Sequence, residues 1–273
     1  MKRLGDGIAG VFLTGILIAT ALLLILPIVV AVAMSFDGAS YMAPFPPHSF
    51  STQWYGSFFG DSYYIDGLKV SVLLAVLATL ISTTAGTAVA VVLDRYDFPG
   101  KALLSSAFMS PMVVGGVVVG FSLLMFLSKL GIDNGVVRLL AGHVIITLPL
   151  TIRSSLAGLA GINPTLEEAA LSLGANERKA FFDITLPLAK TGIIAGGVFA
   201  FAFSMDEVAA SMFLTTTKVY SLPIALISMM RSNFNLTIAA AAVLLLGLTV
   251  VLIVILDRVV GMDRVVGQGT YGG

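Results

Sequence analysis

Uncharged apolar runs of membrane-spanning length divide this sequence, and they constrain the fold more than any other feature. A helix needs about 20 mostly apolar residues to cross roughly 30 Å of hydrocarbon. Four runs without any charged residue cover residues 7–36, 70–93, 102–128 and 232–256. The first run is longer than the roughly 7–15-residue apolar core of a cleaved signal peptide, so we predict a retained helix.

Two further runs are interrupted by charge. Residues 139–160 contain Arg153, and residues 191–214 contain Asp206 and Glu207. Arg153 lies near a helix end, from which a long side chain can reach the interface. Hydrophobic residues make up 58% of the chain and charged residues 11%, whereas a soluble domain carries roughly 25% charged residues. We therefore predict an all-α integral membrane protein with six transmembrane helices.

The distribution of Lys and Arg predicts the orientation, because these residues favour cytoplasmic loops. Six spans place both termini on one side. With the termini in the cytoplasm, ten Lys and Arg lie inside and five outside. The first outer connection, residues 37–66, has no Lys or Arg and is rich in aromatic residues that suit a membrane boundary. We predict an N-terminal helix with this loop (1–66), a core with five helices (67–260) and a flexible tail (261–273).

The inner connection between the fourth and fifth spans, residues 161–190, is longer than a simple turn requires. Asn163 and Pro164 suit the start of a short helix, and Thr165 with Glu168 fits a capping box. Gly174 suits a left-handed helix end, and residues 176–177 begin a second helix. These local signals are compatible with an amphipathic helix on the membrane surface and with a helix that docks on a partner.

The same segment resembles a family signature. Glu168, Ala169 and Ala170, then Gly174 and the run 184–187 (Ile-Thr-Leu-Pro), match the EAA motif of the membrane subunits of binding-protein-dependent ABC importers. Residues 93–101 and 109–120 are also similar to that family, and the resemblance covers about residues 67–257. It implies a type I ABC importer-like fold in the bacterial cytoplasmic (inner) membrane.

The resemblance implies partners as well as a fold. Two ATP-binding subunits would lie on the cytoplasmic side, a second homologous permease subunit would complete the pathway, and a solute-binding protein would lie outside. The short helix would be a coupling helix in contact with an ATPase subunit through Thr165, Leu166, Glu167, Glu168, Ala169, Ala170, Leu171, Ser172, Leu173 and Gly174.

Two adjacent carboxylates in the fifth span need a reason, because an ionised carboxylate at mid-span costs at least about 2.5 kcal/mol. On a continuous helix, Ser204, Glu207 and Ser211 would share one stripe, and Asp206 would point about 100° away. A negative wall would favour a cation in transit. The alternative is a structural role, either an ion pair or a hydrogen bond between helices, with Arg153, Arg138 or Arg231 as partner. We predict a substrate pathway along Ser204, Asp206, Glu207 and Ser211.

Residues 204–208, 222–223 and 229–231 resemble the second permease of spermidine/putrescine-type importers. That resemblance implies a small cationic solute such as a polyamine, although related importers carry other amines and opines. A stand-alone secondary transporter that uses the intramembrane carboxylates is the alternative function. It often shows inverted repeats and broken helices, and neither is visible in the sequence.

Several chemistries have no support in the sequence. No G-x-x-x-x-G-K-[ST] motif is present, so ATP and Mg²⁺ would be used by the partner ATPase, and we predict no cofactor on this chain. Cysteine is absent, and the two histidines, His48 and His143, have no metal-ligand spacing. A zero net charge gives no indication of nucleic-acid binding. We predict that the protein is not an enzyme.

Two GxxxG patterns lie in predicted spans, at 116–120 and 192–196. Small residues at this spacing allow helices to approach closely. Packing within the chain and contact with another subunit are both compatible with the pattern, and packing is the simpler interpretation. His143 is expected to be a hydrogen-bonded packing residue rather than a ligand.

Overall fold

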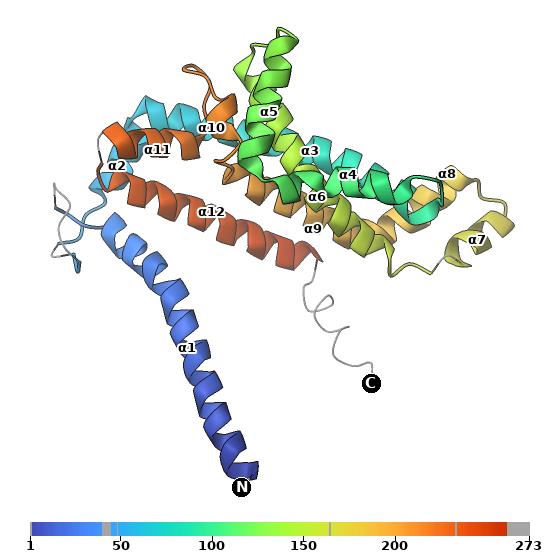
Figure 1. Ribbon diagram of the computed structural model, residues 1–273, viewed down its shortest axis with the longest axis horizontal. Coiled ribbons are helices and arrows are strands. Elements are labelled where there is room, and N and C mark those ends of the chain that lie inside the picture. Colours follow the sequence, from blue (N-terminus) through green and yellow to red (C-terminus); the bar gives the residue numbers. More distant parts are fainter. Residues whose placement is uncertain (1, 40–44, 48, 164, 233, 261–273) are drawn as a thin grey trace. The chain divides into compact units, whose positions relative to one another are not determined.

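The computed structural model describes residues 2–39, 45–47, 49–163, 165–232 and 234–260, and it is helical over most of this length (Figure 1). Within these ranges the extended structure is a single antiparallel bridge between Asp37 and Phe50. The helices are α1 (Lys2–Ser35), α2 (Gln53–Gly60), α3 (Ser62–Arg95), α4 (Lys101–Val114), α5 (Gly116–Lys129), α6 (Gly135–Leu159), α7 (Thr165–Ser172), α8 (Glu177–Ala180), the π-helical η1 (Phe181–Thr185), α9 (Leu186–Met205), α10 (Ser211–Leu214), α11 (Leu222–Ser232) and α12 (Thr237–Val260).

The predicted spans correspond to α1, α3, the α4–α5 pair, α6, α9 and α12. Among the described residues, four helical segments are long and apolar enough to cross a membrane alone: Leu13–Ser35, Ser62–Arg95, Gly135–Leu159 and Glu177–Met205. The last segment joins α8, η1 and α9 into one rod. The α4–α5 pair adds a fifth span if it is counted as one, and α12 contributes the shorter apolar stretch Thr237–Leu252. The all-helical membrane fold is confirmed.

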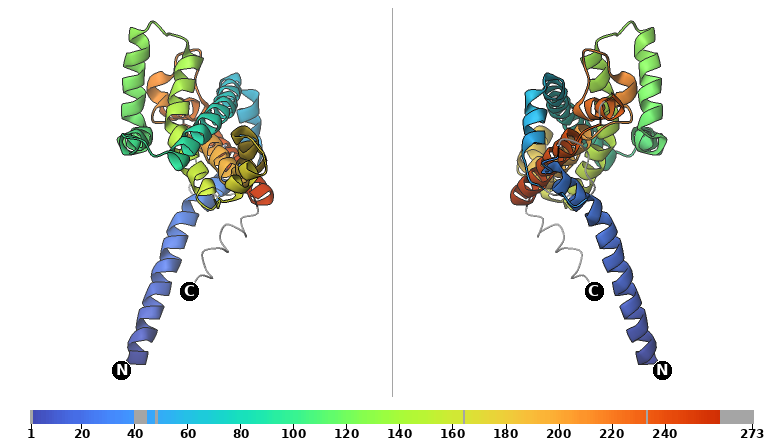
Figure 2. Two further views of the ribbon diagram at one scale, coloured as in Figure 1. Left: turned by 90° about the vertical axis from the view of Figure 1, so that its right-hand side faces the viewer. Right: turned by 90° about the vertical axis from the view of Figure 1, so that its left-hand side faces the viewer.

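The third span is not the straight helix that its hydropathy predicts. Gly115 separates α4 from α5, and the two helices differ in direction by 108°. Figure 2 shows α5 turned away from the line of α4. Gly115 has φ +85°, a conformation that other residues adopt only at a cost, and Pro111 lies in the turn before it. The local chemistry of Gly and Pro therefore accounts for the break.

The fifth span is also interrupted, so the prediction of a continuous helix over 191–214 is wrong. The helix α9 ends at Met205, residues 206–210 are not helical, and α10 is a single turn. The helical stripe expected from the spacing of Ser204, Glu207 and Ser211 does not exist in this form. The break falls at the two carboxylates, Asp206 and Glu207.

The chain divides into two compact units. One holds the described residues up to Ser62 together with Ser228–Leu248, and the other holds Tyr63–Ile227 together with the described residues from Thr249 onward. The predicted division into residues 1–66 and 67–260 stays a prediction. The predicted tail, 261–273, lies outside the described residues.

In the first unit, aromatic residues of the following loop contact the C-terminal end of α1. The indole Nε1 of Trp54 donates to the carbonyl oxygen of Asp37 at 2.7 Å, and the hydroxyls of Tyr55 and Ser35 lie 2.9 Å apart. The Tyr55 ring also packs on Phe36. These contacts fix the chain where it leaves the helix.

In the second unit, α6 and α9 cross through small residues. A Cβ added to Gly192 would lie 2.5 Å from the carbonyl oxygen of Ser154 and 2.7 Å from the Cα of Gly158. Gly196 meets Thr151 and Ser154 in the same way. The pattern at 192–196 therefore serves packing within the chain, as expected.

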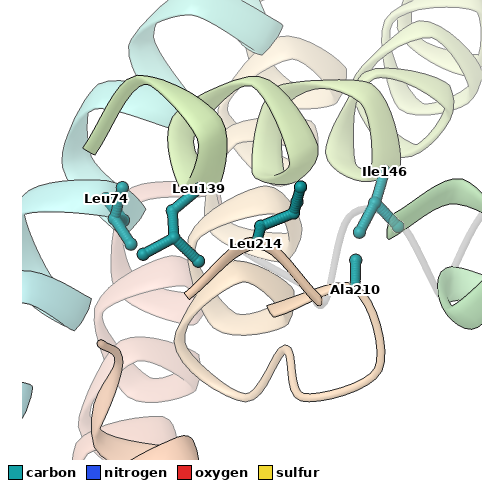
Figure 3. Close-up of a cluster of buried hydrophobic side chains, with 5 residues drawn as sticks. All are labelled: Leu74, Leu139, Ile146, Ala210 and Leu214. Atoms are coloured by element: carbon teal, nitrogen blue, oxygen red, sulfur yellow. The ribbon is translucent and has the colours of Figure 1, made fainter. Parts of the chain in front are cut away.

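The second unit also contains a buried apolar cluster (Figure 3). Leu74 comes from α3, Leu139 and Ile146 come from α6, and Ala210 and Leu214 come from the break and α10. All five side chains are buried. The cluster fixes α10 against α3 and α6, although α10 itself has only four residues.

Candidate functional site

The short helix α7 has the Asn163 cap and the Gly174 end that the local sequence predicts, although Thr165, predicted with Glu168 as a capping box, is instead the first residue of the helix. The Oδ1 of Asn163 accepts a hydrogen bond from the backbone N–H of Thr165 at 3.1 Å. The N–H groups of Gly174 and Ala175 donate to the carbonyl oxygens of Leu171 and Ala170, each at 3.0 Å. This pair of bonds with φ +90° at Gly174 is a Schellman motif. Both ends of α7 are therefore set by sequence signals, and Pro164 lies outside the described residues.

The next turn begins as predicted. The Oδ1 of Asn176 accepts from the backbone N–H of Lys179 at 2.8 Å and caps α8. The chain continues without a break through η1 into α9. A single π-helical turn inside an α-helix is uncommon and is frequently found at functional sites.

An ion pair ties α7 to the end of α3. The Nη2 of Arg95 donates to Glu167 Oε2 at 2.5 Å and to Thr185 Oγ1 at 2.7 Å. The Thr185 hydroxyl lies 3.2 Å from the same carboxylate oxygen and donates to it. The guanidinium also lies over the ring of Phe181, 5.4 Å from its centroid. Three segments distant in sequence meet at this point.

The two adjacent glutamates of α7 have different surroundings. Glu167 is held against α3, whereas Glu168 is exposed. None of the eight residues of α7 is buried. Leu173 is 89% exposed, and Leu166 and Leu171 are also exposed. Of the ten residues predicted for ATPase contact, those with exposed side chains are Thr165, Leu166, Glu168, Ala169, Leu171, Ser172, Leu173 and Gly174, and Glu167 and Ala170 are half-buried.

The carboxylates of the broken fifth span also differ from each other. Glu207 is only 8% exposed, and its Oε1 accepts the backbone N–H of Ala210 at 2.7 Å. Asp206 is exposed. None of the ion pairs among the described residues involves either carboxylate, and Arg138, one of the arginines considered as a partner, pairs with Asp133 instead. Glu207 therefore orders the non-helical turn, and Asp206 remains open to a ligand.

Glycines of α5 make room for this turn. A Cβ on Gly120 would lie 2.7 Å from the Cα of Ala210, and one on Gly116 would lie 2.9 Å from the Cβ of Ala209 and 3.2 Å from Glu207 Oε1. The pattern at 116–120 therefore also packs within the chain. The helix α5 therefore lies directly against this non-helical turn.

His143 joins the two sides of the break. Its Nδ1 lies 2.6 Å from Ser204 Oγ at the end of α9, and its Nε2 lies 3.0 Å from Ser211 Oγ at the start of α10. The side chain is 1% exposed. The expectation of a hydrogen-bonded packing histidine is confirmed. Two of the four predicted pathway residues, Ser204 and Ser211, are brought together through His143 rather than by helical spacing.

Sequence reasoning missed the polar row to which His143 belongs. His143, Thr147, Thr151 and Ser155 recur every four residues on α6, and all are buried. The row is also hydrogen-bonded to Ser82 of α3. The hydroxyls of Ser82 and Thr147 lie 2.7 Å apart and share one hydrogen bond. The hydroxyl of Thr151 donates to the carbonyl oxygen of Ser82 at 2.7 Å. The four-residue spacing on an otherwise apolar span was the available signal.

The described residues contain no group of three or more His, Cys, Asp or Glu side chains that could hold a metal ion. The arrangement offers an exposed helix with both ends capped and a broken span with one exposed carboxylate.

Comparison with known proteins agrees with this geometry. Residues 82–262 match the family described as binding-protein-dependent transport system inner membrane component. The spermidine/putrescine transport system permease protein PotC of Shigella flexneri is 31% identical over 255 residues, which cover 93% of this chain and 96% of that protein. The putrescine transport system permease protein PotI of Escherichia coli (strain K12) is 30% identical over 228 residues, 81% of this chain and 80% of that one.

The fold is similar to that of a solved importer. A chain of the bacterial alginate ABC transporter, in complex with an alginate pentasaccharide-bound periplasmic protein, aligns with a TM-score of 0.73 at 16% identity, over 96% of this chain and 95% of that chain. The similarity extends over nearly the whole of both chains. The family match and the relatives above identify this chain as a member of the binding-protein-dependent transport system inner membrane component family, the membrane-spanning permease subunits of ABC importers.

Proposed function

We propose that this chain forms half of the translocation pathway of an ATP-driven importer for a small organic cation of the polyamine type. The relatives named for spermidine and putrescine transport carry this proposal, because their similarity covers most of the chain. The exposed carboxylate of Asp206 in the broken span agrees with a cationic solute.

The proposed complex has further members. Two ATP-binding subunits on the cytoplasmic side hydrolyse ATP with Mg²⁺, a second homologous permease supplies the other half of the pathway, and a solute-binding protein delivers the cation from outside. Both termini of this chain lie in the cytoplasm, in agreement with the distribution of Lys and Arg. The protein resides in a bacterial cytoplasmic membrane as a multi-pass subunit.

The face of α7 that points away from α3 is the proposed docking surface for an ATPase subunit. It carries Leu166 and Glu168, and the exposed Leu173 follows directly after the helix. An apolar side chain as exposed as Leu173 gains free energy when a partner covers it. The helix caps keep these side chains in a fixed arrangement, so that a push on the surface displaces α7 as a unit.

The position of Asp206 along the span supports a role at the mouth of the pathway. The helix α9 has 20 residues, which correspond to about 30 Å of rise. That length equals the thickness of the hydrocarbon core. With Leu186 at the inner boundary, Asp206 lies toward the outer one, where a carboxylate keeps part of its hydration and can attract a cation.

The first experiment tests the class of transporter. The complex is purified through an affinity tag on this chain and reconstituted in liposomes, and uptake of radiolabelled spermidine and putrescine is measured. We expect uptake only with ATP inside and the solute-binding protein outside. Uptake that runs on a proton or sodium gradient without ATP would instead establish the stand-alone secondary transporter.

The second experiment tests the pathway residues. Asp206→Asn should lower the uptake of spermidine more than about tenfold at low substrate concentration, because the open charge is lost. Glu207→Gln keeps an acceptor for the Ala210 N–H and should be milder. Asp183→Asn, at an exposed acid on the inner side, serves as the control. Unchanged affinity for uptake in Asp206→Asn refutes the cation path.

The third experiment tests docking. Leu173→Asp places a charge in the proposed apolar contact and should release the ATPase subunit from the purified complex, while the chain remains in the membrane. Normal retention of the ATPase together with normal uptake refutes the coupling role of α7.

A further inference from the structure

The ion pair between Arg95 of α3 and Glu167 of α7 gives the two glutamates of α7, Glu167 and Glu168, different roles. Adjacent residues on a helix point about 100° apart. Glu167 points toward Arg95 and Thr185, and Glu168 points into the open. The Glu167 carboxylate is therefore occupied within the chain and is not available as the main contact to an ATPase subunit.

Three hydrogen bonds join the side chains of Arg95, Glu167 and Thr185 pairwise. Nη2 of Arg95 has two hydrogens, one for Glu167 and one for Thr185. The Thr185 hydroxyl accepts from Arg95 and donates its own hydrogen to Glu167. Thr185 is 3% exposed and the two charged side chains are each 24% exposed, so the ion pair is partly shielded from water. Such charge-assisted bonds are shorter and stronger than neutral ones.

The ion pair is also the main side-chain contact that holds α7 to the rest of the chain. No residue of α7 is buried, so a shift of α7 meets no packed core of its own. Arg95, in contrast, ends a helix of 34 residues, about 51 Å long. That helix bonds to α6 through Ser82 and to the start of α11 through Ser71, whose Oγ accepts the N–H of Leu222 at 2.8 Å.

We propose that Arg95, Glu167 and Thr185 form an inner joint that converts movement of the coupling helix into movement of α3. This inference rests on the proposed coupling function of α7. Glu167 and Arg95 are positioning residues, because they contact neither nucleotide nor solute. Thr185 adds η1 to the joint, and the ring of Phe181 supports the guanidinium from the same π-helical turn.

The experiment measures coupling in the reconstituted complex. Arg95→Gln and Glu167→Gln should each lower the amount of spermidine transported per ATP hydrolysed by about five- to tenfold, while the ATPase subunit still co-purifies. Thr185→Val should have a smaller effect in the same direction. The double variant R95E/E167R should recover much of the ratio, because the Thr185 hydroxyl can donate to or accept from either partner. Asp183→Asn, in the same π-helical turn, should match wild type.

Three outcomes overturn the joint. A wild-type transport ratio in both single variants shows that the ion pair is not used, and failure of the charge-reversed pair to exceed the single variants shows that pairing is not what matters. Loss of the ATPase subunit from Glu167→Gln assigns Glu167 to docking instead. Failure of the proposed function is separate, since it appears as normal ATPase retention and uptake in Leu173→Asp. Thermal unfolding of each variant distinguishes lost coupling from a misfolded chain.

Discussion

The crossing of α6 and α9 offers a sharp test, because it depends on the missing side chain of Gly192. In Gly192→Ala, the new Cβ would lie 2.5 Å from the carbonyl oxygen of Ser154, and 2.7 Å and 2.8 Å from the Cα and N of Gly158. All three are backbone atoms of α6, so no change of rotamer can relieve them. Carbon contacts are optimal at about 3.5–4.0 Å, and the helices must therefore separate by about 1 Å.

The free energy of this change has two terms of opposite sign. Forcing a methyl group into a packed interface costs about 1–3 kcal/mol. Replacing Gly by Ala inside a helix returns roughly 0.5–1 kcal/mol through backbone entropy. We expect a net destabilisation of about 1–2 kcal/mol, which corresponds to a fall of about 2–8 °C in the unfolding midpoint of a chain of this size.

The matched control is Gly247→Ala in α12, where no atom lies within 4 Å of the added Cβ. Only the favourable helix term applies there, so its midpoint should equal or exceed that of wild type. Thermal unfolding in detergent, followed by fluorescence, compares the two variants with wild type. The reasoning is refuted if Gly192→Ala and Gly247→Ala shift the midpoint equally.

Two further predictions concern polar groups. His143→Phe removes the hydrogen-bond partner of Ser204 and Ser211 and should destabilise the protein by about 1–3 kcal/mol. The triple variant, with both serines also changed to Ala, should regain part of this loss because no buried polar group is left unpaired, and equal unfolding midpoints for the two variants would contradict this account. In the loop after α3, the hydrogen bond and charge of Lys101 lower the pKa of Asp97. A lowered pKa adds stability above the unfolded-state value of about 4 and loses it as pH falls further. Because the Asp97 side chain is 98% exposed, the contribution is screened, and Asp97→Asn should leave the unfolding midpoint unchanged between pH 5 and 8; a clear fall at pH 7 that vanishes near pH 3 would show a stronger pair.

The ends of α7 and the start of α8 could be predicted from the sequence because they depend on short-range chemistry. An Asn side chain reaches a backbone N–H two or three residues ahead, and a Gly adopts a positive φ without help from distant residues. Asn163, Gly174 and Asn176 behave in this way. The spans could be predicted because length and hydropathy decide them.

The break in the fifth span could not be predicted in the same way. The contacts that hold it come from α5 and α6, which lie elsewhere in the chain. Gly120 admits the backbone of Ala210, and His143 holds Ser204 and Ser211. Hydropathy carries no information about such contacts. The break in the third span was easier to predict from the sequence, because Gly115 follows Pro111 by four residues.

The ion-pair partner of Glu167 could not be predicted from the sequence for a related reason. The capping argument places Glu167 in the first turn of α7, where the helix dipole favours a negative charge. Nothing local says that Arg95, 72 residues earlier, comes within 2.5 Å. The sequence therefore predicts residues 165–174 as one contact surface. Only the fold distinguishes the side of α7 that contacts Arg95 from its exposed side.

On the proposed function, packing decides how a movement of α3 spreads through this subunit. The helices α6 and α9 touch through backbone atoms at Gly158 and Gly192, and α3 is bonded to α6 through Ser82, so these three helices resist sliding. The break has few backbone bonds of its own: after the N–H of Asp206 donates to Ala202, the next backbone bond to a residue four positions earlier is that of Met212 to Val208. Side chains hold it instead, because Glu207 accepts the N–H of Ala210 and His143 bonds to the serines on both sides. A force that enters at α3 therefore reaches Asp206 through α6 and these side-chain contacts, so a loss of the His143 contacts should weaken the transmission to the break.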